Sequence, residues 1–169
     1  MGEFHYALSL HYNYLGIHFT NYKMRYVFLE NFQVSEDKES LEGTLSIKRE
    51  WSIFEDHFPG FPLMPGALIV EAFAQHTVAL MLEFKQDKTA VIPTLIQVDR
   101  ARFLEFVIPD ATLKIVVKKE AAMYPNFKFG CEASVGNNTV ATARLTMAFR
   151  ETPGMGGLDF MGFFLKGGN

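Results

Sequence analysis

One apolar stretch in the middle of the chain constrains the fold more than any other feature of the sequence. Pro65 suits the first turn of a helix, and residues 67–84 follow without glycine or proline. Segments 67–70 and 78–82 are apolar on nearly every side of such a helix. A helix that is hydrophobic all round has to be covered on all sides. Because Glu71, Gln75 and His76 interrupt the run, we expect protein to cover it and expect no membrane span.

Strand-like segments flank this predicted helix on both sides. Residues 41–49 alternate between apolar and polar side chains, which is typical of a strand with one face in water. The other segments with strand character are 26–34, 90–97, 99–107, 112–120, 127–135 and 139–149. This order of elements predicts an α+β protein, in which a strongly bent, mainly antiparallel sheet of about six strands wraps around one long central helix.

The length and composition favour one domain with additional segments at both ends. The chain has 169 residues, 49% of them hydrophobic, and no linker divides it. We interpret residues 24–151 as the folded domain, residues 1–23 as an N-terminal arm or short helix, and residues 152–169 as a flexible tail rich in glycine and phenylalanine. The formal charge of −3 provides no basic field for nucleic acid.

The cysteine and histidine residues argue against several kinds of site. Cys131 is the single cysteine, so an intrachain disulfide or a multi-cysteine zinc site is excluded, and we interpret it as a small core residue. It also indicates a reducing compartment, so we expect a cytoplasmic protein. His5, His11 and His18 lie six and seven residues apart, which suits no common zinc motif, and we expect no metal.

Two titratable residues around the start of the helix form a candidate catalytic pair. Glu71 lies in the apolar run, where burial would favour the protonated acid; the alternative is an exposed stripe with Gln75 and Glu83. His57 precedes segment 58–66, in which three prolines and two glycines stiffen the chain up to the helix N-terminus. Unpaired N–H groups there can stabilise an oxyanion. The alternative for His57 is simple packing.

The stretch HFPGFPLMPGALIVEAFAQ, residues 57–75, resembles the active-site segment of the β-hydroxyacyl-acyl-carrier-protein dehydratases of fatty-acid synthesis, which have the hotdog fold. RYVFL at 25–29 resembles the Arg-Tyr-Pro-Phe-Leu motif of that family, with Val27 in place of proline. VDRARF at 98–103 resembles the strand after the central helix. The resemblance runs from about residue 25 to residue 149 and implies an α+β hotdog fold.

The resemblance implies a role for each residue of the active-site segment. His57 would be the base that removes the α-proton, and Glu71 the acid that protonates the departing β-hydroxyl. The Gly66 N–H would hold the thioester oxygen, the Leu63 carbonyl would fix the tautomer of His57, and Gln75 would help to position Glu71. No metal or organic cofactor is required. The product would be a trans-2-enoyl thioester, and Glu71 in place of aspartate favours the non-isomerising type.

We expect a homodimer in which the partner supplies the acid, as the resemblance implies. Glu71 lies about 7.5 Å along the helix axis from Gly66, and the prolines before the helix discourage a fold-back within one chain. The resemblance also allows a trimer of dimers. An apolar tunnel for the acyl chain is expected beside the helix, lined by Phe61, Leu68, Phe73 and Ala74. The alternative is that these side chains only pack against the sheet.

Both the residues that contact the carrier protein and the reaction itself have alternative interpretations. Residues 104–106 stand where the family often has basic side chains, so contact with an acidic acyl-carrier protein would fall to a set of other cations. These are Arg100, Arg102, Lys114, Lys118 and Lys119. A solvated strand face is the alternative for each lysine. The competing functions are a hotdog thioesterase and a non-catalytic acyl-binding subunit.

Overall fold

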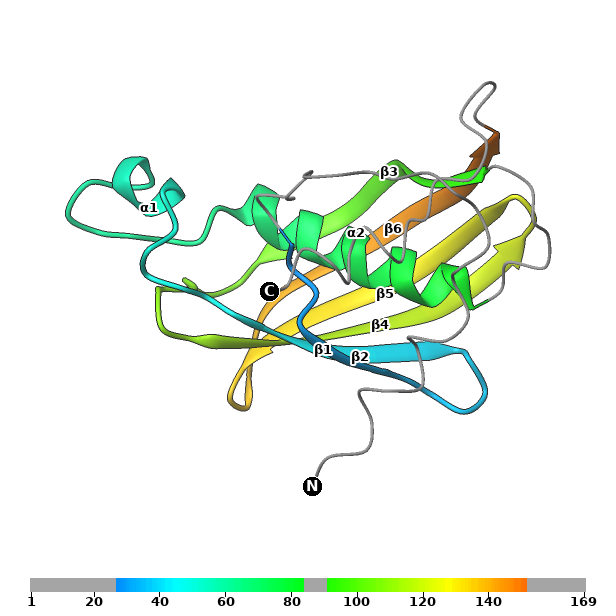
Figure 1. The fold of residues 1–169 in the computed structure, drawn as a ribbon, viewed down its shortest axis with the longest axis horizontal. Helices are drawn as coiled ribbons and strands as arrows, with labels where there is room; N and C mark the ends of the chain where they lie inside the picture. Colours follow the sequence, from blue (N-terminus) through cyan, green and yellow to red (C-terminus); the bar gives the residue numbers. More distant parts are fainter. Residues whose placement is uncertain (1–26, 84–90, 152–169) are drawn as a thin grey trace, which may run out of the picture.

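A computed structural model describes residues 27–83 and 91–151, and the predicted arm and tail lie outside these ranges (Figure 1). The helices are α1 (Ile53–Asp56) and α2 (Gly66–Leu82). The strands are β1 (Asn31–Val34), β2 (Ser40–Ser46), β3 (Val91–Phe103), β4 (Thr112–Met123), β5 (Asn126–Val135) and β6 (Asn138–Glu151).

The six strands form one antiparallel sheet that bends around α2 (Figure 1). Their order is β1-β2-β4-β5-β6-β3, so β1 and β3 are the edge strands. The predicted α+β hotdog fold is confirmed. Among the described residues, no helix is long and apolar enough to cross a membrane.

Two of the predicted strands, 90–97 and 99–107, are wrong as separate elements because they form the single strand β3. The pairing of β3 with β6 shifts twice, between Leu95 and Gln97 and between Asp99 and Arg102. Each shift is a β-bulge, which breaks the alternation of side chains without ending the strand. The short helix α1 was not predicted, since four residues carry too little periodicity to be recognised.

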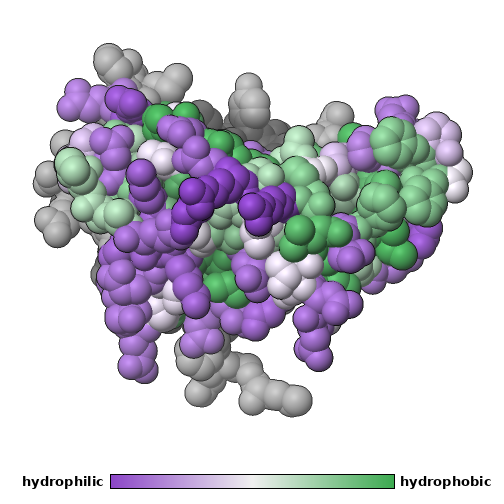
Figure 2. Space-filling model, turned by 180° about the vertical axis from the view of Figure 1, so that it is seen from behind, coloured by the Kyte–Doolittle hydropathy of each residue, from purple (hydrophilic) through white to green (hydrophobic). Residues whose placement is uncertain are grey.

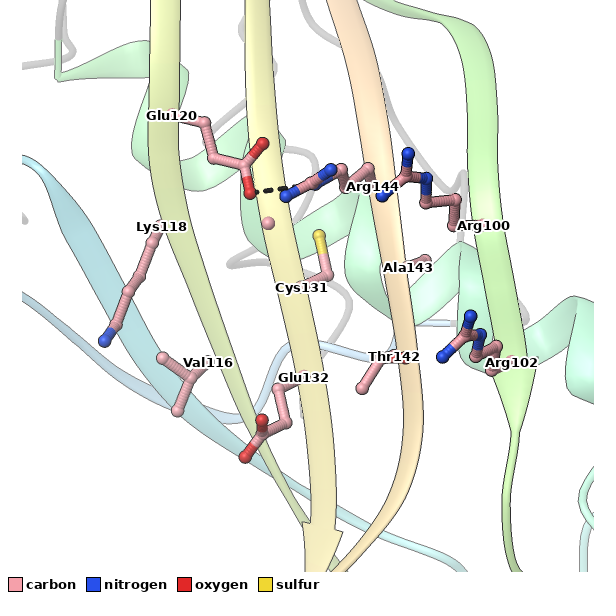
Figure 3. A pocket seen from close by; sticks show the side chains of 11 residues that line it. Arg100, Arg102, Val116, Lys118, Glu120, Cys131, Glu132, Thr142, Ala143 and Arg144 are labelled. Atoms are coloured by element: carbon pink, nitrogen blue, oxygen red, sulfur yellow. Dashed lines mark hydrogen bonds and ion pairs between the residues drawn. The ribbon is translucent and has the colours of Figure 1, made fainter.

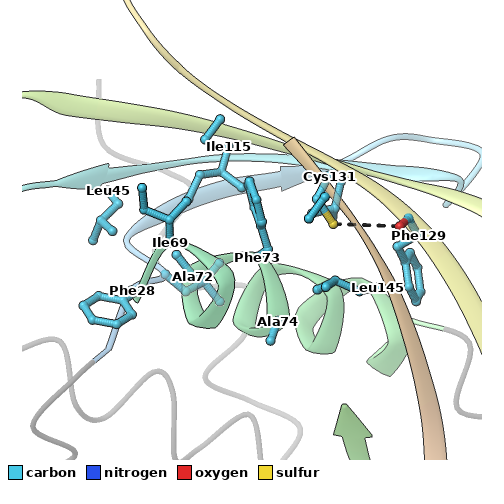
Figure 4. Packing of buried hydrophobic residues seen from close by; sticks show 14 of the residues in the cluster. Phe28, Leu45, Ile69, Ala72, Phe73, Ala74, Ile115, Phe129, Cys131 and Leu145 are labelled. Carbon is cyan, nitrogen blue, oxygen red and sulfur yellow. Dashed lines mark hydrogen bonds between the residues drawn. The ribbon is translucent and has the colours of Figure 1, made fainter. Parts of the chain in front are cut away.

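The core lies between α2 and the inner face of the sheet (Figure 4). Ala72 and Phe73 of α2 are fully buried and face a layer of strand residues that includes Ile115, Phe129 and Leu145. Cys131 belongs to this core with 5% exposure, as predicted. Burial raises the pKa of its thiol to about 12. The apolar residues of the long helix are therefore accounted for where the bent sheet packs against it.

A buried histidine of α2 rests directly on a glycine of β2. His76 is fully buried, and its Nδ1 lies 2.8 Å from the carbonyl oxygen of Ala72. A Cβ atom at Gly43 would lie 2.6 Å from Nε2 of His76, closer than packed atoms approach. Glycine at position 43 therefore lets the helix close onto the sheet.

Gly43→Ala is expected to lower the free energy of unfolding by about 1–3 kcal/mol, the usual cost of overpacking a core. Urea unfolding of purified protein measures the change. The double variant Gly43→Ala, His76→Ala should be more stable than the sum of the two single changes predicts, because the new methyl group then has room. Additive effects of the two substitutions would contradict the contact.

Candidate active site

A compact loop between α1 and α2 holds the imidazole of His57. The backbone N–H of Leu63 donates to the His57 carbonyl at 2.8 Å, and His57 Nδ1 lies 3.0 Å from the Leu63 carbonyl oxygen. Between them, Phe58 and Phe61 exchange two backbone hydrogen bonds, and Gly60 supplies the positive φ of 78° that this tight turn requires. Leu63 therefore holds both the backbone of His57 and one nitrogen of its ring.

The tautomer of His57 follows from this geometry. A carbonyl oxygen can only accept a hydrogen bond, so Nδ1 must carry the ring proton. Nε2 of the neutral ring then keeps its lone pair and can accept a proton from a substrate. His57 is half-buried, so this nitrogen is not sealed inside the protein.

The N-terminus of α2 combines free backbone donors with a glycine on which an aromatic ring packs. Helix α2 begins at Gly66. Its first backbone bonds run from the N–H groups of Leu68 and Ile69 to the Pro65 carbonyl, so the N–H groups of Gly66 and Ala67 precede the hydrogen-bonded part of the helix. A Cβ atom at Gly66 would lie 2.8 Å from Cζ of Phe103, so only glycine fits beneath that ring. This donor end can accept negative charge on an oxygen atom.

The second β-bulge of β3 places the Phe103 ring over Gly66. Asp99 pairs with Arg144, and Arg102 pairs with Thr142. Between these two pairs β3 advances by three residues and β6 by two, so β3 contains one extra residue. The next pair, Phe103 with the fully buried Ala141, consequently faces α2. Without the extra residue, Phe103 would lie on the opposite face of the sheet, because side chains alternate along a strand.

Glu71 is exposed in this chain, so the expectation that packed hydrocarbon of its own chain surrounds it is wrong. The predicted exposed stripe is only partly present: Glu83 is exposed, but Gln75 has 2% exposure. The sheet covers only part of the helix circumference, and Ala67, one turn before Glu71, is exposed as well. The carboxyl group therefore lies on the open side of α2.

A hydrogen-bonded chain orients this carboxyl group. The buried backbone N–H of Phe28 donates to Gln75 Oε1 at 2.7 Å. Since an N–H group bonds the amide oxygen, the amide nitrogen must point the other way, and Gln75 Nε2 donates to Glu71 Oε1 at 2.9 Å. The contact of Gln75 with Glu71 could be anticipated from their i, i+4 spacing, whereas the donor at Phe28 was not recognised.

The four residues predicted to line an acyl tunnel differ in their exposure to solvent. Phe73 and Ala74 are core residues with 0% and 8% exposure, and Leu68 packs at the edge of the core. Phe61 is 54% exposed and meets Phe106 edge to face, with ring centroids 6.1 Å apart. Phe61 lies in the loop that follows α1, and hydrophobic residues gather on the surface at the end of the molecule that carries α1 (Figures 1 and 2).

The predicted carrier contacts divide into two sets. Arg100, Arg102 and Lys118 line one groove on the outer face of the sheet (Figure 3). Lys119 instead reaches Glu39 at 2.5 Å and is 17% exposed, and Lys114 pairs with Glu42 at 2.8 Å. Within residues 27–83 and 91–151, no three metal-ligating side chains cluster.

The sequence has clear relatives among known proteins. A family model described as a FabA-like domain matches residues 26–144. The 3-hydroxyacyl-[acyl-carrier-protein] dehydratase FabZ of Polynucleobacter necessarius subsp. necessarius (strain STIR1) is 35% identical over 129 residues, which cover 75% of this chain and 85% of that protein. The enzyme of the same name from Lactobacillus helveticus (strain DPC 4571) is 34% identical over 122 residues, covering 71% and 80%.

Solved structures share the fold at lower identity. A chain of the dehydratase heterocomplex ApeI:P from Xenorhabdus doucetiae matches with a TM-score of 0.63 and 19% identity, covering 78% of this chain and 88% of that chain. A mutant thioesterase from Pseudomonas aeruginosa matches with a TM-score of 0.55 and 18% identity, covering 70% and 78%. The family model spans most of the described domain and the sequence relatives align across it, so this chain belongs to the FabA-like family.

Proposed function

We propose that the chain is a 3-hydroxyacyl-[acyl-carrier-protein] dehydratase of the non-isomerising type, a lyase of fatty-acid or related acyl-chain synthesis. The observation that carries this proposal is the Nδ1 contact of His57 with the Leu63 carbonyl, which leaves Nε2 as a base in the loop that leads into α2. The sequence relatives named above are 3-hydroxyacyl-[acyl-carrier-protein] dehydratases.

The reaction removes one water molecule from a 3-hydroxyacyl thioester. Nε2 of His57 takes the α-proton, and the electron pair of that C–H bond moves toward the thioester carbonyl. The N–H of Gly66 stabilises the negative charge that develops on the carbonyl oxygen. A protonated Glu71 gives its proton to the β-hydroxyl, the C–O bond breaks, and water and the trans-2-enoyl thioester result.

The acid in each site comes from a partner subunit in this proposal, so the active unit is a homodimer. The edge strand β3 has no partner on its free side among the described residues, and Leu95, Ile96 and Val98 are 37%, 43% and 40% exposed there. A second copy against this edge and the open side of α2 would cover both these residues and Glu71. Burial there would favour the protonated acid that the reaction needs.

Mixing two inactive variants tests this arrangement. His57→Ala and Glu71→Gln, unfolded and refolded together in equal amounts, are expected to regain about a quarter of the parent activity, since half of the dimers would be mixed and each would hold one complete site. Each variant refolded alone is the control. No recovery, together with proof that mixed dimers form, would place base and acid in the same chain.

The reaction itself is tested with a panel of 3-hydroxyacyl thioesters, following water loss by mass spectrometry and release of free thiol in the same samples. We expect water loss without thiol release. Thiol release would identify a thioesterase, and neither product would indicate a non-catalytic acyl-binding subunit. The proposal includes a carrier-bound substrate, a cytoplasmic location, and an acyl tunnel that forms only between the two protomers, near Phe61 and Leu68.

A further inference from the structure

The face of the sheet turned away from α2 is hollowed by a groove of about 490 Å³ (Figure 3). It crosses β3, β4, β5 and β6, and its lining includes four cations and two carboxylates. These are Arg100, Arg102, Lys118 and Arg144, with Glu120 and Glu132. Hydrophilic residues dominate the middle of this face in the view from behind (Figure 2). The groove thus lies on the opposite side of the sheet from the helix that carries Glu71.

Three of the four cations have no ion pair with any described residue. Arg144 donates to Glu120 at 3.1 Å, but Arg100, Arg102 and Lys118 have no carboxylate within ion-pair distance in the described ranges. Elsewhere most described cations are paired with carboxylates, among them Lys38, Lys48, Arg49, Lys114 and Lys119. The groove therefore holds a local excess of positive charge, four cations against two carboxylates, in a chain whose formal charge is −3.

Two features of the backbone bring these charged side chains together in the groove. The β-bulge of β3 sets Arg100 at a φ of 51°, a left-handed conformation that disfavours side chains other than glycine, and both Arg100 and Arg102 line the groove. On β5, Gly130 leaves the floor open: a Cβ there would lie 2.7 Å from Glu120 Oε1. Glu120 of β4 can thus reach across β5 to Arg144 of β6 (Figure 3).

We propose that this groove binds a phosphate group of a small ligand, at a site separate from the catalytic loop. Guanidinium groups match phosphate oxygens with paired donors, and a hollow of this size suits a small molecule rather than a protein surface. Glu120 and Glu132 would repel the carboxylates of an acidic protein laid across the groove. The phosphate can belong to a free phosphate ester or to the pantetheine arm of an acyl carrier, and only the second source rests on the proposed function.

Calorimetric titration with inorganic pyrophosphate at low salt, without any thioester, tests the site. The double variant Arg100→Gln, Arg102→Gln is expected to bind about tenfold more weakly or worse, because it loses charge-assisted contacts. Lys128→Gln is the matched control: Lys128 is an exposed cation of β5 that has no ion pair among the described residues and does not line the groove. It should bind like the parent protein.

A variant that is expected to bind pyrophosphate more tightly separates a real site from a folding defect, because a misfolded protein would only bind more weakly. Glu120→Gln removes a negative charge and releases Arg144, so it should bind pyrophosphate several-fold more tightly than the parent. The site would be refuted by no saturable binding to the parent, or by equal affinities of the parent, the double variant and Glu120→Gln. Because no turnover is measured, failure of the dehydratase assay would not affect this result.

Three further ligands distinguish the two sources of the phosphate. Coenzyme A, apo-carrier protein and holo-carrier protein are each titrated into the parent and into the double arginine variant. Tighter binding of holo-carrier than apo-carrier, lost in the double variant, assigns the groove to the pantetheine arm. Binding of coenzyme A or pyrophosphate with no difference between the two carrier forms assigns it to a free phosphate ester. Equal binding of both carrier forms that the variant abolishes, without pyrophosphate binding, would show an acidic protein surface and overturn the proposal.

Discussion

His57→Ala is expected to lower kcat for dehydration of a 3-hydroxyacyl thioester by roughly 10² to 10⁴-fold, the usual contribution of a positioned general base. The loop that holds the ring is bonded through backbone atoms of residue 57 as well, so the fold should persist. Glu71→Gln should cause a comparable loss, since the amide keeps the shape of the side chain but cannot deliver a proton. Substrate binding should be retained by both variants.

Glu83→Gln is the control for these two substitutions. It removes an exposed carboxylate that directly follows the same helix, and it lies far along the chain from the catalytic loop. Steady-state kinetics on matched substrate, with unfolding curves to show that all variants are folded, separates a catalytic loss from a structural one. Turnover within a few-fold of the parent in both His57→Ala and Glu71→Gln would defeat the proposed mechanism.

The buried His76 is expected to make the protein about 3 kcal/mol less stable as the pH falls from 6.5 to 4. Burial lowers its pKa from 6.5 to about 4, and its Nε2 has no hydrogen-bond partner in the described structure. Above pH 6.5 the ring is neutral in both states and the contribution is fully present. Between pH 6.5 and 4 the His76 ring is protonated in the unfolded chain but stays neutral in the folded chain. Lowering the pH in this range therefore favours unfolding.

Urea unfolding at a series of pH values measures this effect when the parent is compared with His76→Leu. Other groups also titrate in this range, so the informative quantity is the difference between the two proteins. The parent should lose more stability than His76→Leu over this interval, with a difference of about 1.4 kcal/mol per pH unit where the titration is steepest. Parallel pH profiles would show that His76 takes up a proton in the folded state without cost.

Elements that depend on local chain geometry could be predicted from the sequence. The apolar run after Pro65 predicts α2 to within two residues of its end at Leu82, because helix propensity and periodicity act over a few turns. The clamp of His57 by Leu63 spans six residues, and the contact between Glu71 and Gln75 spans one helical turn. The prolines and glycines of the loop restrict the first of these arrangements, and the helix itself fixes the second.

Several parts of the candidate sites depend on contacts between distant segments. Phe28 reaches Gln75 across 47 residues, and Gly43 meets His76 because β2 packs under the helix. The residues next to Phe28, Gln75, Gly43 and His76 in the sequence give no indication of these two contacts. Arg144 likewise joins Arg100 and Arg102 only through the pairing of β6 with β3, so it was absent from the predicted cation set.

The amino-acid sequence by itself determined the central helix and the order of helix and strands, since these follow from short-range patterns of apolar residues, proline and glycine. The hotdog class of fold and the roles of the loop residues followed from the resemblance of residues 57–75 to a known family. Only the tertiary structure decided which side of α2 stays open, where β3 bulges, and which cations share a groove. One inserted residue in a strand moves every later side chain to the other face, so the bulge places Phe103 over Gly66 and contributes to the groove behind it.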